Sequence, residues 1–170
     1  MTAFQTGKKS PNRLKTVSVE DGDHPKEECG LFGIYGLTDS ATHTALGLHA
    51  LQHRGQEAAG IVAYDGEQFH SHRALGLVGD NFNSPDVMAR LAGDMTIGHV
   101  RYSTTGETVL RNVQPLFADF KFGGLAVAHN GNLTNAYGIR KQLVERGCIF
   151  QSTSDTETII HLIAISEYGR

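Results

Sequence analysis

The sequence is poor in residue types whose abundance would point to particular classes of protein. Its 170 residues include two cysteines, four prolines and no tryptophan. Cys29 and Cys148 are too few for a disulfide framework, and their spacing matches neither CxxC nor CxC. Each thiol is therefore expected to be free, and either inert or reactive.

Long apolar runs and an excess of charge are missing as well. No stretch approaches the roughly 18 consecutive apolar residues of a membrane-spanning helix, and the first residues lack the apolar block of a signal peptide. The formal net charge of −3 gives no basic footprint for nucleic acid or anionic membranes. These absences predict a cytoplasmic globular protein that binds neither nucleic acid nor membrane.

Glycine, in contrast, is abundant, with 20 residues in the chain. The first 28 residues differ from the rest, because they carry ten charged side chains and few apolar ones, which is typical of a flexible leader. At Cys29 the composition changes abruptly to CGLFGIYG, a short apolar run with glycines that predicts a buried strand.

Apolar periodicity and turn residues predict an α+β domain of sheets covered by helices. Helices are expected at about 40–53, 84–91, 135–147 and 155–168, and strands on both sides of an Asp65–Gly66 turn, over 95–104 and over 123–133. The last helix carries Ile159, Leu162 and Ile163 on one face. A whole apolar face so near the end of the sequence predicts that more protein follows.

Common motifs for nucleotide, zinc-protease and serine-hydrolase sites are missing from the sequence. His49 and His53 are spaced as a metal pair, but no third ligand follows at the required spacing, so no metal site is expected. Five polar clusters that include glycines remain at the ends of the expected strands and helices. They are residues 29–30, 53–57, 101–104, 129–132 and 152–157.

Each cluster alone would indicate a turn or a helix cap, but together they supply the groups needed to hydrolyse an amino-acid side-chain amide. A thiol is a nucleophile, an arginine can bind an α-carboxylate, and an aspartate can bind an α-ammonium group. An Asn–Gly turn offers two N–H donors to a developing oxyanion. The missing base would be created by cleavage between Glu28 and Cys29, which frees an α-amino group beside the thiol.

The motifs EECGLFGIYG, ALQHRGQEAAGI, GHVRYSTTG, AHNGNL and STSDTE lie in this order across residues 27–157. On these motifs the sequence resembles the glutaminase domain of the N-terminal-nucleophile (class II) glutamine amidotransferases, most narrowly the amidophosphoribosyltransferase family of purine biosynthesis. The glucosamine-6-phosphate synthase branch, an alternative, shows RGYDSAG and HTRWATHG where this chain has RGQEAAG and HVRYSTTG.

The resemblance implies a four-layer αββα sandwich of two antiparallel sheets, the N-terminal-nucleophile hydrolase fold. It implies that Cys29 is the nucleophile and becomes the mature N-terminus, with its own α-amine as the general base. The side chain of Asn130 and the backbone N–H of Gly131 would form the oxyanion hole.

Four further residues are implied to bind the substrate glutamine. Arg101 would bind its α-carboxylate and Asp155 its α-ammonium group. Arg54 would lie near the nucleophile, and Tyr102 would belong to a lid, running from Arg101 to about Leu110, that closes over the substrate.

The resemblance also implies a division of the chain into a propeptide, residues 1–28, and a glutaminase domain, residues 29–170, truncated at its C-terminus. In the whole enzyme the ammonia would react with phosphoribosyl pyrophosphate to give phosphoribosylamine in a transferase domain missing here. That enzyme would use Mg²⁺ and, in one subgroup, a 4Fe–4S cluster, with ligands outside this chain, and would be a homo-oligomer. Two alternatives remain: a non-catalytic glutamine-binding module and an amide hydrolase for another substrate.

Overall fold

The structure is a computed structural model of the chain and describes residues 29–52, 57–102 and 108–166. The expected leader, residue Arg54 and residues 103–107 of the expected lid lie outside the described residues. No helix within the described ranges is long and apolar enough to cross a membrane.

Four strands form an antiparallel sheet in the order β1-β4-β2-β3. They are β1 (Gly30–Tyr35), β2 (Ala58–Tyr64), β3 (Phe69–Leu75) and β4 (Met95–Arg101). The register pairs Gly30 with Val100 and Ala58 with Arg101, so the first residues of β1 and β2 flank the last residues of β4. Cys29, one residue before β1, therefore lies at the end of β4.

The predicted hairpin between β2 and β3 is confirmed. Gly66 takes a φ of 100° in the turn, a conformation that favours glycine. Hydrogen bonds from the N–H of Gln68, the His70 ring and the N–H of Glu67 hold the pKa of Asp65 well below its usual range. This turn lies at the end of the sheet opposite Cys29, because residue 58, and not residue 64, pairs with the end of β4.

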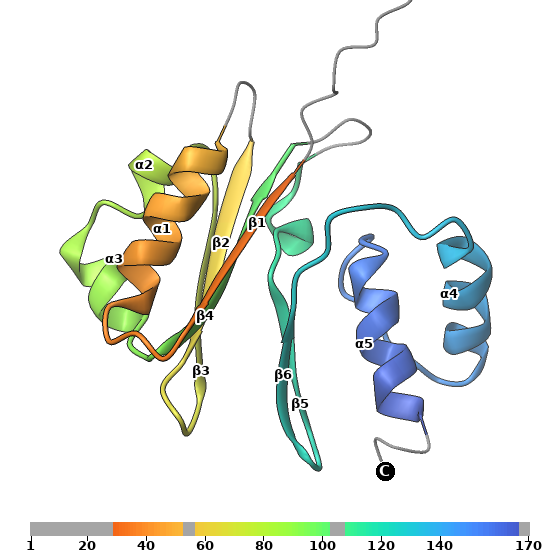
Figure 1. Cartoon of the computed structure of the whole chain (residues 1–170). Helices are drawn as coiled ribbons and strands as arrows, with labels where there is room; N and C mark the ends of the chain where they lie inside the picture. Colours follow the sequence, from red (N-terminus) through yellow and green to blue (C-terminus); the bar gives the residue numbers. More distant parts are fainter. Residues whose placement is uncertain (1–28, 53–56, 103–107, 167–170) are drawn as a thin grey trace, which may run out of the picture.

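Three helices cover one face of this sheet (Figure 1). They are α1 (Ser40–Leu51), α2 (Val78–Asn81) and α3 (Pro85–Arg90), and α1 contacts β1, β4 and β2. Leu48 of α1 and Ile61 of β2 are fully buried in the core between helix and sheet. A Cβ on Gly98 would lie 2.7 Å from the Leu48 side chain, so the glycine permits the close approach of α1 to β4.

A second sheet and two helices form the other half of the molecule. The sheet pairs β5 (Leu116–Phe120) with β6 (Gly123–Val127), and it is preceded by the 3₁₀ helix η1 (Leu110–Asn112) and followed by α4 (Ala136–Glu145) and α5 (Thr156–Ile165). The rings of Phe69 in β3 and Phe117 in β5 lie 6.2 Å apart, so the two sheets pack face to face. Figure 1 shows the four layers, with α4 and α5 outside the smaller sheet. The predicted αββα architecture is confirmed.

One detail of the predicted core is wrong. The strand after Cys29 is not buried throughout, since Leu31 is 41% and Tyr35 80% exposed. Both residues point away from α1 on an edge strand that pairs only with β4. On the last helix, the face that carries Ile159, Leu162 and Ile163 is only partly covered, with Leu162 40% exposed, whereas Ile160 and Glu157 are buried.

Candidate active site

The Cys29 side chain lies at the start of β1 and contacts the chain just after β4. It is a free, half-buried thiol. The backbone N–H of Tyr102 lies 3.4 Å from its sulfur, and the thiol lies 3.6 Å from the carbonyl oxygen of Tyr102. The sulfur can therefore act as donor or, once deprotonated, accept the Tyr102 N–H, while part of its surface stays open to a substrate.

The Asn130–Gly131 turn, in the second half of the sandwich, contacts Cys29 as well. The Asn130 amide nitrogen donates a hydrogen bond of 2.5 Å to the carbonyl oxygen of Cys29. A carboxamide NH₂ group has two donors, so one remains after this bond. Gly131 has a φ of 134°, which side chains rarely adopt, and glycine is thus required for the turn.

Arg101 is the last residue of β4 and lies opposite Cys29, one position beyond the last pair of the β1–β4 ladder. Because strand residues alternate, Arg101 and His99 face the second sheet, while Val100 between them belongs to the core under α1. The Arg101 Nε is buried and has no hydrogen-bond partner among the described residues. The guanidinium group is therefore available to an anionic group that enters this space.

His99 is fully buried next to these residues. Burial, and secondarily the positive charge of Arg101, lower its pKa to about 4, although a hydrogen bond toward Asn130 opposes the shift. That hydrogen bond is poor in geometry, since neither ring nitrogen has a well-oriented partner in the described part of the chain. The ring is thus neutral at physiological pH and adds no second positive charge beside Arg101.

Asp155 precedes α5 and contacts the loop that carries the Asn130–Gly131 turn. Its Oδ2 accepts a 2.7 Å hydrogen bond from the N–H of Leu133 and lies 3.9 Å from Nδ1 of His129. The carboxylate therefore fixes the loop downstream of Gly131, and its other oxygen accepts no hydrogen bond from the part of the chain that the structure describes.

The sequence analysis placed Glu157 in a polar cluster but gave it no role; in the structure it holds the loop that precedes α5. Its carboxylate is 9% exposed and accepts hydrogen bonds of 2.7–2.8 Å from the N–H groups of Gln151 and Ser152 and from the Ser152 hydroxyl. The sequence signal for this role is a carboxylate in the first turn of an amphipathic helix, on the face that is buried in the structure. His99 was missed because a histidine within a β-rich run shows no chemistry of its own.

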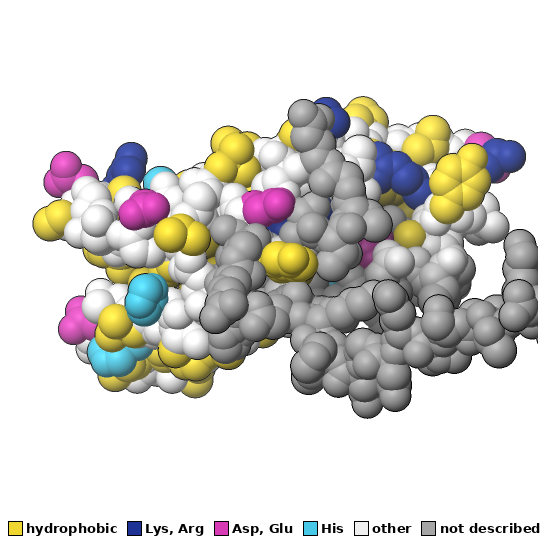
Figure 2. Space-filling model, turned by 90° about the horizontal axis from the view of Figure 1, so that it is seen from above, with side chains coloured by type: hydrophobic (Ala, Val, Ile, Leu, Met, Phe, Trp, Pro, Cys, Tyr) yellow, Lys and Arg dark blue, Asp and Glu magenta, His cyan; other side chains and the backbone are white. Residues whose placement is uncertain are grey.

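The structure brings three of the predicted site residues, Cys29, Tyr102 and Asn130, into direct contact. Arg101 lies beside them on β4, and Asp155 contacts the loop that carries Gly131 rather than Cys29 itself. Figure 2 looks onto the end of the sandwich at which β1 begins, where acidic and basic side chains are interspersed and neither sign forms a continuous patch on the visible surface.

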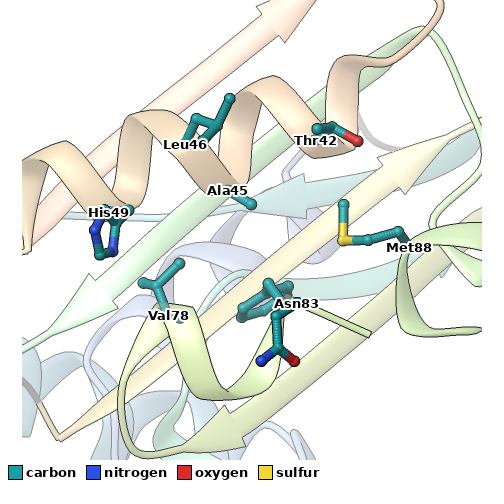
Figure 3. Close-up of a pocket in the computed structure, with 9 residues that line it drawn as sticks. Thr42, Ala45, Leu46, His49, Val78, Asn83 and Met88 are labelled. Atoms are coloured by element: carbon teal, nitrogen blue, oxygen red, sulfur yellow. The ribbon is translucent and has the colours of Figure 1, made fainter. Parts of the chain in front are cut away.

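A pocket of about 260 Å³ lies elsewhere, between α1 and the α2–α3 segment (Figure 3). It is lined mainly by apolar side chains, including Leu46, Val78 and Met88, with His49 at one end. None of the candidate site residues lines it, and it is on the opposite face of the four-stranded sheet from Arg101. We therefore assign it no part in the chemistry at Cys29.

Comparison with known proteins decides the family. Residues 99–170 match a family model described as a glutamine amidotransferase domain. The chain is 53% identical over 137 residues to an amidophosphoribosyltransferase of Lacticaseibacillus casei, in an alignment that covers 81% of this chain and 71% of the relative. The chain belongs to the amidophosphoribosyltransferase family.

Other amidophosphoribosyltransferases are much longer. One from Rhizobium etli is 61% identical over 149 residues, which are 88% of this chain and 30% of the relative, so the chain spans only that share of its length. A solved glutamine phosphoribosylpyrophosphate amidotransferase of B. subtilis, complexed with ADP and GMP, matches with 47% identity and a TM-score of 0.73, over 81% of this chain and 29% of the other.

The solved amidophosphoribosyltransferase confirms the N-terminal-nucleophile hydrolase fold that the resemblance implied. A second solved structure, described as the allosteric regulatory enzyme of purine biosynthesis, matches with 48% identity and a TM-score of 0.75, over 81% of this chain and 30% of that one. The glucosamine-6-phosphate synthase alternative is therefore not favoured.

Proposed function

We propose that this chain is the glutaminase part of an amidophosphoribosyltransferase, in which Cys29 attacks the side-chain amide of glutamine and releases ammonia. The observation that supports this most directly is the meeting of three distant segments at one residue. The main chain of Tyr102 contacts the Cys29 sulfur, and the Asn130 amide contacts the Cys29 carbonyl. A thiol, an Asn–Gly turn and an arginine whose Nε has no partner among the described residues then lie close together.

The leader, residues 1–28, is removed in this proposal, so that Cys29 becomes the first residue of a glutaminase domain over 29–170. Its α-amino group, with a reference pKa near 8, takes the proton of the thiol directly or through a water molecule. The thiolate attacks the γ-carbonyl carbon of glutamine. Because the base belongs to the same residue as the nucleophile, no other side chain is needed for this proton transfer.

The negative charge that develops on the carbonyl oxygen is stabilised by the Asn130 side chain and the N–H of Gly131. Collapse of the tetrahedral intermediate breaks the C–N bond, and the ammonium group returns the proton to the leaving nitrogen, which departs as ammonia. Water then hydrolyses the γ-glutamyl thioester to glutamate and restores the thiol. Removing one oxyanion donor typically costs about 10²–10³ in rate.

The two charged ends of glutamine select the substrate. Arg101 binds the α-carboxylate through a guanidinium group whose Nε has no partner among the described residues. Asp155 binds the α-ammonium group with the carboxylate that also holds the N–H of Leu133. The proposal also assigns Arg54, which lies outside the described residues, and Tyr102 to the binding of glutamine.

In the complete enzyme, the ammonia reacts with phosphoribosyl pyrophosphate in a part of the protein outside these residues and yields phosphoribosylamine for purine synthesis. The described residues contain no group of three or more histidine, cysteine, aspartate or glutamate side chains placed to hold a metal ion. In this proposal, any Mg²⁺ ion and 4Fe–4S cluster of the complete enzyme are held by residues outside this chain. A homo-oligomeric, cytoplasmic enzyme completes this proposal.

Controlled removal of the leader tests the proposal. A protease site placed directly before Cys29 gives the same chain with and without residues 1–28, and mass spectrometry identifies the N-terminus. We expect glutamate release from glutamine only after cleavage, and no release by Cys29→Ala, while Cys148→Ala retains activity. Glutamate release by Cys29→Ala, or by protein that still carries the leader, would contradict the proposal.

A further inference from the structure

Gln114 is a buried polar residue to which the proposed chemistry gives no role. It lies between η1 and β5 and is 4% exposed. Its side-chain oxygen accepts a 2.7 Å hydrogen bond from the N–H of His129, and its side-chain nitrogen lies 3.3 Å from the carbonyl oxygen of His129. One amide group thus satisfies both main-chain polar groups of His129.

The contact between Gln114 and His129 lies just beyond the end of the β5–β6 ladder. The β5–β6 ladder runs from Phe120 paired with Gly123 to Leu116 paired with Val127. In the same register the residue opposite His129 would be Gln114, two positions beyond this last pair. The side chain of Gln114, and not its backbone, thus bonds to the main chain of His129 two positions beyond the end of the ladder.

The residues that follow His129 are the oxyanion turn, Asn130 and Gly131. On its upstream side the turn is held at His129 by Gln114, and on its downstream side at Leu133 by Asp155. Gly131, with a φ of 134°, thus lies between two anchored residues.

Gln114 itself is held firmly. Val113 is fully buried, and its carbonyl oxygen accepts a 3.2 Å hydrogen bond from Arg73. A Cβ on Gly60 would overlap the Gln114 carbonyl oxygen, so β2 packs directly against this segment. Asn112 bonds to both the N–H and the hydroxyl of Thr153, at 2.9 and 2.8 Å. These contacts hold the backbone of residues 112–114 in place between the two sheets, and with it the side-chain amide of Gln114.

We propose that Gln114 is a positioning residue for the oxyanion hole: through its two hydrogen bonds to His129 it orients the Asn130 side chain and the Gly131 N–H. This inference rests on the proposed glutaminase function. Oxyanion donors act only when they are held close to the position that the charge will occupy. Loss of the anchor is therefore expected to lower kcat and leave glutamine binding, which depends on Arg101 and Asp155, nearly unchanged.

The experiment compares Gln114→Met and Gln114→Glu with the wild-type full chain after removal of the leader. Gln114→Met keeps the length of the side chain and removes both hydrogen bonds. We expect its kcat for glutamate release to fall about 10- to 100-fold, less than for loss of a donor itself, with KM changed by less than about twofold. Alkylation of Cys29 by iodoacetamide, which forms no oxyanion, should keep its wild-type rate.

Gln114→Glu gives a second readout that a structural role would not produce. As a carboxylate, the new side chain can accept from the His129 N–H but cannot donate to the His129 carbonyl, whereas the protonated acid can do both. Its kcat, divided by the wild-type value at the same pH, should therefore rise as pH is lowered.

Thr44→Val is the matched control, since it removes a buried 2.6 Å hydrogen bond between the Thr44 and Thr96 hydroxyls on the other face of β4. It should keep the wild-type kcat. The inference is overturned if Gln114→Met retains the wild-type kcat, if Thr44→Val loses as much, if alkylation slows in parallel, or if the Gln114→Glu ratio does not change with pH. If the wild type releases no glutamate after removal of the leader, the proposed function itself is overturned. If the wild type releases glutamate and Gln114→Met has the same kcat, only the role of Gln114 is overturned.

Discussion

The buried His99 makes the stability of this fold sensitive to acid. Its pKa is about 4 in the folded chain against 6.5 for a free histidine, because burial and the positive charge of Arg101 disfavour the protonated ring. Above pH 6.5 the ring is neutral in both states and the group has no effect on the free energy of unfolding. As pH falls from 6.5 toward 4, the unfolded chain gains a proton that the folded chain does not, so stability is lost.

The size of the effect follows from the two pKa values. At 1.36 kcal/mol per unit, the loss from His99 should be about 2 kcal/mol at pH 5 and about 3 kcal/mol at pH 4. His99→Met removes the titrating group and gives up little hydrogen bonding, since neither ring nitrogen has a well-oriented partner among the described residues. The variant should therefore become more stable relative to the wild type as the pH is lowered.

Urea unfolding of both proteins at pH 7, 6, 5 and 4 measures this difference, and carboxylates common to both cancel. The control is His72→Gln: the pKa of His72 is also lowered by burial, and secondarily by Arg90, but this ring is partly exposed, so the difference should be smaller. Parallel pH profiles for the wild type and His99→Met would refute the reasoning, because His99 would then be protonated equally in the two states.

Three other perturbations give separate tests. Leu48→Ala, at a fully buried position, should lower the free energy of unfolding by about 2–5 kcal/mol in urea titrations, while Leu46→Ala on the 62% exposed side of the same helix should cost much less; equal losses would contradict the assigned core. Arg101→Ala should raise the KM for glutamine about 10- to 100-fold by removing charge-assisted hydrogen bonds, and an unchanged KM in steady-state assays would remove its proposed role. Gly131→Ala would place a Cβ 3.1 Å from a histidine ring at a φ of 134°, so we expect a lower kcat, whereas Gly66→Ala in the remote hairpin turn should keep the wild-type kcat; equal kcat values for the two variants would contradict the need for glycine at 131.

The sequence was sufficient to predict the elements that are determined by residues close together in the chain. The helix over 40–53 and the hairpin around Asp65–Gly66 were predicted by apolar periodicity and turn residues, and both are present. The structure brings Tyr102 and Asn130 into contact with Cys29, although the resemblance did not specify these contacts. The catalytic roles of these residues stay predictions until activity is measured.

Other features depend on contacts between distant segments and left no readable pattern. The strand over Leu116–Phe120 was not predicted, because it is short, follows a proline and gains its partner only through β6. The burial of Gln114 could not be read from its neighbours, since its hydrogen-bond partner is 15 residues away. His99 is buried because a second sheet covers that face of β4, a packing that the strand's own residues do not specify.

The central claim is that the Cys29 thiol, activated by its own α-amine, forms a γ-glutamyl thioester. The most direct measurement is mass spectrometry with peptide mapping after the leader-free protein has been mixed with glutamine and quenched in acid. We predict a γ-glutamyl adduct on the peptide that begins with Cys29, and none on protein that still carries residues 1–28. Glutamate release with the adduct on Cys148, or with an adduct formed equally on uncleaved protein, would contradict the account.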